Sequence, residues 1–144
     1  MSGLAAVLAG RTEPGIYQWH GAFDAETVRH TVEHAGWQFG LLDGWQEESK
    51  EEFLAGIGQA LGFGAHYGHN FDALSDCLHD LRAGDSSGYL LLWDGWSPFA
   101  RADSRAFSVS LSVLGGRVNS DRGGPFVVLL RGEGPHLDGI SSLD

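Results

Sequence analysis

Tyr89-Leu-Leu-Leu-Trp93 is a run of five hydrophobic residues that ends at Asp94-Gly95, a typical turn pair. Phe126-Val-Val-Leu-Leu130 repeats the pattern further along the chain. Continuous apolar runs of this length are typical of strands buried on both faces, as in parallel sheets. Because segments of helical pattern separate such runs, we expect right-handed βαβ crossovers, a mostly parallel sheet and an α/β fold.

Residues that begin helices stand between the expected strands. Asp24 precedes one amphipathic stretch, and Ser49 precedes another with Glu52 at the capping-box spacing. Asn70 is expected to cap a third helix that runs to about Arg82.

The segments around these helices complete the expected order. Residues 15–20 and 37–42 are further strand candidates. From 98 to about 118 the pattern is helical, but serines and Gly115-Gly116 interrupt it. Residues 132–144 are predicted to be loop.

Composition narrows the class of protein. The 144 residues, 42% of them hydrophobic, match one globular domain and not a disordered chain, so we expect a single domain over 1–144. The 19 Asp and Glu residues against 9 Lys and Arg give a net charge of -10. Such a surface repels nucleic acid and attracts basic proteins, so we expect no direct contact with nucleic acid.

Cysteine usage and hydropathy favour the cytoplasm. The single cysteine, Cys77, cannot form an internal disulfide, which is typical of a reducing compartment. No stretch approaches the roughly 18 apolar residues of a membrane span. The apolar run near residue 5 has no basic residue ahead of it and is interpreted as a frayed or docking terminus. We expect a cytoplasmic protein with no cofactor and no membrane partner.

The third expected helix is amphipathic. At about 100° per residue, Leu74 and Leu78 fall on one face and Asp72, Asp76 and Asp80 on the opposite one. Like charges four residues apart destabilise a helix by roughly 0.2–0.5 kcal/mol, so helix stability does not explain this arrangement.

The surroundings of this helix are acidic and aromatic. Residues 43–80 contain eight acidic residues and one basic residue, Lys50. The loop before the helix adds His66, Tyr67 and His69 beside two glycines, a mixture typical of protein contact surfaces. An acidic helix alone is most simply a solvated face. Because this helix lies next to the aromatic loop, we interpret the two together as a surface that docks into a cationic cleft.

The segment Tyr67-Gly-His-Asn-Phe-Asp-Ala-Leu-Ser-Asp-Cys-Leu78 resembles the Tyr-Gly-x-Asn-x-Asp-Ala-Leu-x-Asp-Cys-Leu signature of the barstar family, intracellular inhibitors of a secreted ribonuclease. The order of the expected elements over residues 36–131 is similar as well. The resemblance implies a barstar-like fold with a three-stranded parallel sheet flanked by helices. Residues 1–35 would add a strand and a helix to it.

The resemblance also implies a partner and a binding surface. The signature helix and the preceding loop would block the active site of a small secreted, guanyl-specific microbial ribonuclease in a 1:1 complex. Asp76 would replace a substrate phosphate among arginine and histidine side chains, and Asp72 would add a second charge. A carboxylate suits arginine, and opposite fields speed association, an effect for which this family's own complex is the standard example. The other implied contact residues are His66, Tyr67, Gly68, Asn70, Ser75 and Asp80.

Some positions depart from the family. Ser75 stands where the family has a large aromatic residue, and His66 where it has a tyrosine, so an apolar anchor is smaller here. The family also uses a glutamate from the helical stretch before the last strand. Of the nearest residues here, only Asp121 could substitute; the others are Gly116, Val118 and Ser120.

Two alternative functions stay open. His30-Thr-Val-Glu33-His34 matches the H-x-x-E-H pattern of zinc hydrolases, in which two histidines bind the metal and the glutamate activates water. No third ligand is evident, so we predict neither an enzyme nor a metal site. The second alternative is an immunity protein for another basic toxin.

Gly84-Asp-Ser-Ser-Gly88 fits a nucleophile-elbow pattern but leads from helix to strand, so it is predicted to be a turn.

Overall fold

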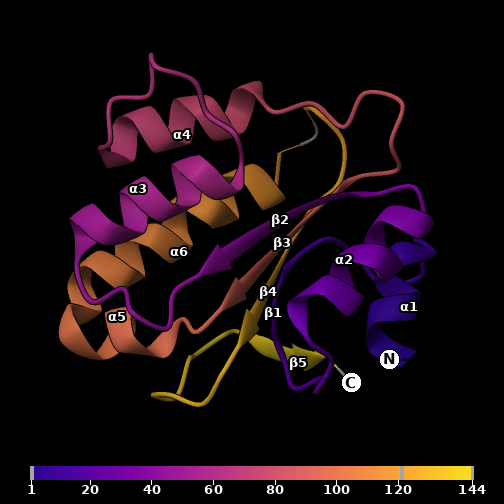
Figure 1. Ribbon diagram of the computed structural model, residues 1–144, viewed down its shortest axis with the longest axis horizontal. Coiled ribbons are helices and arrows are strands. Elements are labelled where there is room, and N and C mark those ends of the chain that lie inside the picture. Colours follow the sequence, from indigo (N-terminus) through magenta and orange to yellow (C-terminus); the bar gives the residue numbers. More distant parts are fainter. Residues whose placement is uncertain (1, 121, 144) are drawn as a thin grey trace.

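The computed structural model describes residues 2–120 and 122–143 (Figure 1). Its helices are α1 (Ser2–Leu8), α2 (Ala25–His34), α3 (Lys50–Ala60), α4 (Phe71–Asp80), α5 (Ser97–Ala102) and α6 (Ser104–Val118). Its strands are β1 (Ile16–Trp19), β2 (Gln38–Asp43), β3 (Tyr89–Asp94), β4 (Phe126–Arg131) and β5 (Ser141–Leu143). None of the helices within those ranges is long and apolar enough to cross a membrane.

Across the described residues the strands form one five-stranded sheet in the order β2-β3-β4-β1-β5. Every neighbouring pair is parallel. The two apolar runs, β3 and β4, lie side by side, and only the last residue of each is partly exposed. The predicted α/β class and the parallel sheet are therefore confirmed.

The sheet is wider than predicted. The expected three strands, β2, β3 and β4, are joined by β1 at the free edge of β4 and by β5 beyond it. The sequence predicted loop over 132–144, but Ser141–Leu143 is a strand paired with β1. Two of its three residues are serines, so no apolar run marks it. Its hydrogen-bonding partner comes from the other end of the chain.

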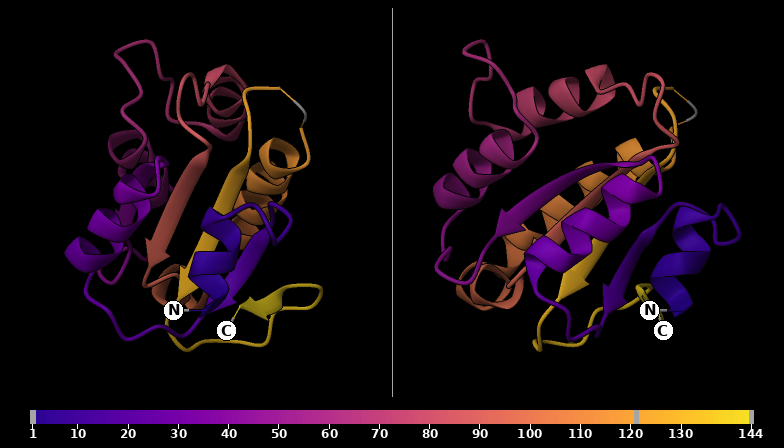
Figure 2. Two further views of the ribbon diagram at one scale, coloured as in Figure 1. Left: turned by 90° about the vertical axis from the view of Figure 1, so that its right-hand side faces the viewer. Right: turned by 45° about the vertical axis from the view of Figure 1, so that its right-hand side comes forward.

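Helices cover both faces of the sheet (Figure 2). Helices α3 to α6 pack on one face, and α1 and α2 pack on the other. Side chains alternate along β3: Trp93 lies in the first core, where its ring stacks 4.9 Å from that of Phe53, and Leu92 lies in the second. A strand that is apolar on both faces needs cover on both.

The N-terminal extension supplies the second layer. Leu4 and Val7 of α1 and Val28 and Val32 of α2 are buried against the sheet with Trp19 of β1. The strand and the helix predicted within residues 1–35 are present as β1 and α2. Helix α1 was not predicted, and the structure shows that the apolar terminus docks as a helix.

The predicted helix starts are confirmed. The side chains of Asp24, Ser49 and Asn70 each accept a hydrogen bond from the backbone N–H three residues on, at 2.8, 3.1 and 2.8 Å. Glu52 Oε1 accepts in return from the N–H of Glu48 at 3.0 Å. Each bond satisfies a donor that the start of a helix leaves free.

The helical stretch after residue 97 divides at a different place from the one predicted. Asp103 ends α5 and caps α6, where its Oδ1 accepts from Ala106 N at 3.0 Å. The predicted interruption at Gly115-Gly116 is wrong, since α6 runs through both glycines to Val118. A glycine costs a helix about 1 kcal/mol relative to alanine, and the buried side chains of Leu114 and Arg117 in the same turn offset this cost.

Arg131, at the end of β4, ties the N-terminal extension to the sheet. Its guanidinium binds the Asp94 carboxylate through two hydrogen bonds of 3.0 and 2.9 Å. It also donates to the carbonyls of Gly21 and Phe23, in the connection from β1 to α2.

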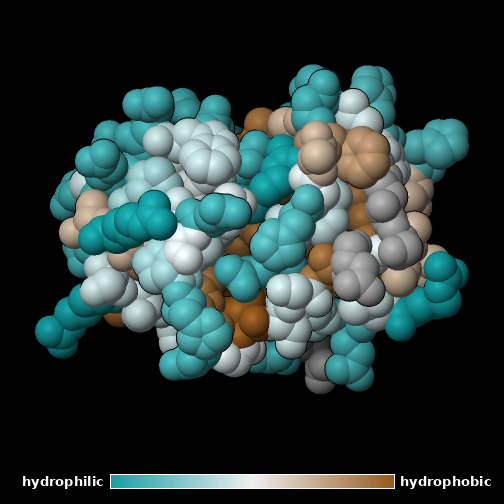
Figure 3. Space-filling model, turned by 90° about the horizontal axis from the view of Figure 1, so that it is seen from below, coloured by the Kyte–Doolittle hydropathy of each residue, from teal (hydrophilic) through white to brown (hydrophobic). Residues whose placement is uncertain are grey.

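Figure 3 shows the molecule from below, where hydrophilic residues surround small hydrophobic areas.

Candidate functional site

The loop before α4 is held in shape by its own side chains. Asn70 caps the helix and its Nδ2 donates to Gly68 O at 3.4 Å. His69 adopts a left-handed backbone conformation, with φ of 52°, and its ring lies 4.7 Å from the ring of Tyr67. The loop therefore enters α4 at a defined angle.

Tyr67 supports the loop from inside the protein. Its side chain is buried, its hydroxyl donates to Leu54 O at 3.0 Å, and burial raises its pKa to about 12. The ring lies on Gly58 of α3, where an added Cβ would come within 2.7 Å of it. The side chain of Tyr67 thus positions the loop, while the neighbouring His66 and Gly68 are exposed.

The acidic face of α4, defined by Asp72, Asp76 and Asp80, points to solvent as predicted. All three side chains are exposed, and none forms an ion pair or a side-chain hydrogen bond within the described residues. Ser75 and His79 are half-buried. The face therefore offers three carboxylates that have no partner in the part of the chain that the structure describes.

The opposite face of α4 anchors the helix. Leu74, Cys77 and Leu78 are buried. Burial, with Asp80 and Asp76 nearby, raises the pKa of the Cys77 thiol. Cys77 therefore behaves as a small apolar residue, as predicted.

A buried arginine fastens the C-terminal end of α4. Arg117 of α6 is 1% exposed, and its Nε donates to Leu78 O at 3.0 Å. Its Nη1 donates to Gly124 O at 3.1 Å and its Nη2 lies 3.5 Å from Leu81 O. Sequence analysis missed Arg117, because an arginine in a helix normally indicates a surface position.

Four residues around the end of α6 were considered as replacements for the family's glutamate. Asp121 lies outside the described residues. Of the other nearby residues, Gly116 is exposed with open space around it, and Val118 and Ser120 are half-buried. None of these three carries a carboxylate.

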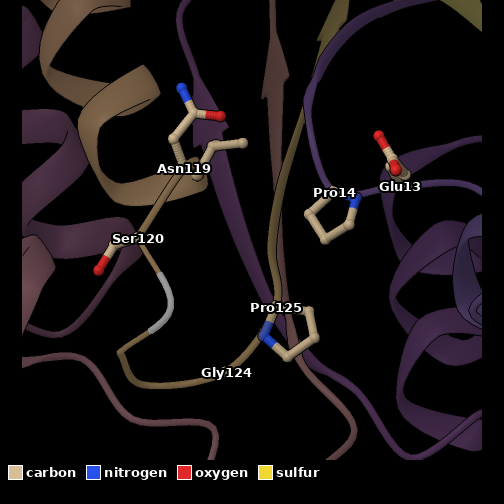
Figure 4. Close-up of a pocket in the computed structure, with 7 residues that line it drawn as sticks. Glu13, Pro14, Asn119, Ser120, Gly124 and Pro125 are labelled. Atoms are coloured by element: carbon tan, nitrogen blue, oxygen red, sulfur yellow. The ribbon is translucent and has the colours of Figure 1, made fainter.

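A cavity of about 380 Å³ lies beyond the end of α6 (Figure 4). It is bounded by Glu13 and Pro14 before β1, by Asn119 and Ser120 after α6, and by the turn at 124–125. Glu13 is the one titratable side chain in this described lining. The cavity therefore lacks a pair of groups for acid–base chemistry.

The zinc-binding pattern is not completed in space. His30, Glu33 and His34 are all exposed on α2. Across the part of the chain that the structure describes, no three His, Cys, Asp or Glu side chains are grouped so as to hold a metal ion. The segment 84–88 is a turn, as predicted, and Ser86 Oγ donates to Ala83 O within it.

Glu47, between β2 and α3, is a half-buried carboxyl group in an unfavourable environment. Its Oε1 is buried and has no hydrogen-bond partner among the described residues. Burial raises its pKa from 4.5 to about 7, and the charges of Glu52 and Asp43 add to the effect. The ionised form of Glu47 therefore destabilises the fold.

We expect Glu47→Gln to stabilise the protein at alkaline pH. The pKa of Glu47 is higher in the folded than in the unfolded state, so its contribution to the free energy of unfolding is most favourable below pH 4.5 and is lost as pH rises through 7. By pH 8 the ionised Glu47 lowers the free energy of unfolding by an amount on the order of 1–3 kcal/mol. The uncharged glutamine of the variant avoids this loss. Urea unfolding at pH 5 and pH 8 measures the difference. Glu48→Gln, at an exposed position, should show the same change in the free energy of unfolding between pH 5 and pH 8 as the wild type. The same change in Glu47→Gln would show that Glu47 is not the destabilising group.

Comparison with known proteins agrees with the signature. Residues 37–131, about two thirds of the chain, match the family model described as Barstar (barnase inhibitor). No curated protein matches the chain closely enough to count as a relative. The matched region holds β2, β3 and β4 with the four helices of one face, α4 and its capped loop included. The chain therefore belongs to the barstar family.

Proposed function

We propose that this protein inhibits a small secreted, guanyl-specific microbial ribonuclease by placing the acidic face of α4 and the loop of residues 66–70 in its active site. The observation that carries the proposal is the set of three exposed carboxylates on α4, which have no partners among residues 2–120 and 122–143. They lie on a helix anchored at both ends, in a chain of net charge -10 that belongs to a family of barnase inhibitors.

Each residue has a role in this complex. Asp76, in the middle of the acidic face, binds the arginine and histidine side chains that normally hold a substrate phosphate. Asp72 adds a charged contact one turn earlier, and Gly68 and Asn70 contact the enzyme from the loop. The other proposed contacts come from His66, Ser75, Asp80 and Asp121. Tyr67, whose buried ring points inward, supports the loop instead of supplying a side chain to the interface.

Anchoring of the helix favours tight binding. Asn70 orders the first turn of α4 and Arg117 the last, while Tyr67 fixes the loop. A surface that is ordered before binding loses less conformational entropy when the complex forms. The small Ser75 leaves room that a large aromatic residue fills elsewhere in the family, and this favours a ribonuclease with a bulkier surface opposite it.

The inhibitor acts in the cytoplasm, where it protects the cell from the ribonuclease before export. It needs no cofactor and performs no catalysis. Steric and electrostatic occupation of the enzyme's active site is sufficient for inhibition.

The test is a titration of the purified protein into a small guanyl-specific ribonuclease, with RNA cleavage as the readout. We expect activity to fall linearly and to reach zero at one equivalent. A basic protein without a nucleotide cleft should bind only weakly and lose the interaction at moderate salt. Full cleavage at tenfold excess of inhibitor, with several such ribonucleases, would contradict the proposal and direct attention to another basic toxin.

A further inference from the structure

A small cavity of about 160 Å³ opens between α4 and the loop that follows α3. It is too small for a drug-sized ligand, whose sites span roughly 300–1,000 Å³, and it has the size for one side chain. The residues that matter to its chemistry are Leu61, Phe63, His66, Cys77, Asp80 and Leu81.

The lining combines an apolar wall with one negative charge. Leu61 is buried, and Phe63 and Leu81 are partly buried and pack against the core. Asp80 is exposed and forms no ion pair within the described residues, so its carboxylate is available to a partner. Among the described residues that line it, there is neither a lysine nor an arginine.

The cavity adjoins the surface proposed for inhibition. Asp80 lies one helical turn, about 6 Å, beyond Asp76, and His66 belongs to the loop before α4. A ribonuclease whose active site covers Asp76 would therefore bring neighbouring side chains over this opening.

We propose that this cavity receives one arginine side chain of the ribonuclease, outside the set that binds Asp76. This inference rests on the proposed function. The guanidinium pairs with Asp80, and the apolar stem lies against Leu81 and the ring of Phe63. Arginine suits such a site better than lysine, because its planar, weakly hydrated head stacks on aromatic rings and binds a carboxylate through two hydrogen bonds.

The test compares two variants that lose the same charge. Asp80→Asn keeps the shape of the cavity and removes its charge, while Glu33→Gln removes a charge from α2 on the other face of the sheet. We expect Asp80→Asn to raise the Kd for the ribonuclease about 10- to 100-fold, mainly through faster dissociation. Glu33→Gln should stay within about twofold.

A double-mutant cycle then identifies the partner residue. Each arginine and each lysine of the ribonuclease is replaced in turn by alanine and tested against both wild type and Asp80→Asn. We expect to find one arginine whose replacement removes the effect of Asp80→Asn on the Kd. If wild type inhibits and Asp80→Asn binds equally well, or couples only to a lysine, the arginine site is wrong and the proposed function stands. If wild type inhibits no ribonuclease, both proposals fail.

Discussion

Asp76→Ala should raise the Kd for the ribonuclease by about 100- to 1,000-fold, the largest effect that we expect from any single change on the acidic face of α4. Asp76 lies between Asp72 and Asp80 on an exposed helix face and has no partner within the described residues. In the proposed complex its carboxylate is buried among cationic side chains. Truncating one partner of such a pair costs about 2–5 kcal/mol, because the other charges stay buried and unpaired, as is well known for this family's own complex.

Inhibition constants for three variants measure this effect. Asp76→Asn separates charge from shape and should lose nearly as much affinity as Asp76→Ala. His30→Ala, on α2 and outside the proposed interface, should leave inhibition unchanged. Equal losses for Asp76→Ala and His30→Ala would exclude the acidic face as the centre of binding.

Arg117→Ala should lower the free energy of unfolding by about 3 kcal/mol. The guanidinium is almost fully buried and donates to carbonyls at the end of α4 and in the turn before β4. It also lies 5.1 Å above the ring of Phe126. Its loss leaves buried carbonyls without donors and opens a cavity. Burial also disfavours the charged guanidinium and lowers the pKa of Arg117, so removing the charge brings a gain. We expect the two costs to exceed this gain.

Urea unfolding at neutral pH measures this change, with Arg82→Ala as the matched control. Arg82 also donates to carbonyls at the end of α4, those of His79 and Leu81, but it is exposed, so its loss should cost about 0.5 kcal/mol. Arg117→Met, which fills the space without donating hydrogen bonds, separates packing from polar contacts. Equal midpoints for Arg117→Ala and Arg82→Ala would contradict the role of Arg117.

Local patterns in the sequence were sufficient for much of the fold and of the candidate site. The caps at Asp24, Ser49 and Asn70 depend on bonds that reach only three residues along the chain. The apolar runs of β3 and β4 require burial on both faces wherever they lie. The exposed acidic face of α4 follows from helical periodicity alone.

Features that depend on contacts between distant segments could not be predicted in this way. Tyr67 lies in a loop beside two exposed histidines, and only its hydrogen bond to Leu54 and its packing on Gly58 show that its ring points inward. Strand β5 exists because β1 offers it an edge, and α1 because the second face of the sheet must be covered.

The amino-acid sequence therefore decided the family, the α/β class, the helix starts and the position of the acidic residues, since each depends on neighbours within about one or two helical turns. Tertiary structure decided the width of the sheet, the layer formed by residues 1–35, the inward turn of Tyr67 and the burial of Arg117. Those features arise from hydrogen bonds and apolar contacts between residues that are far apart in the chain, and their partners become neighbours only when the sheet assembles.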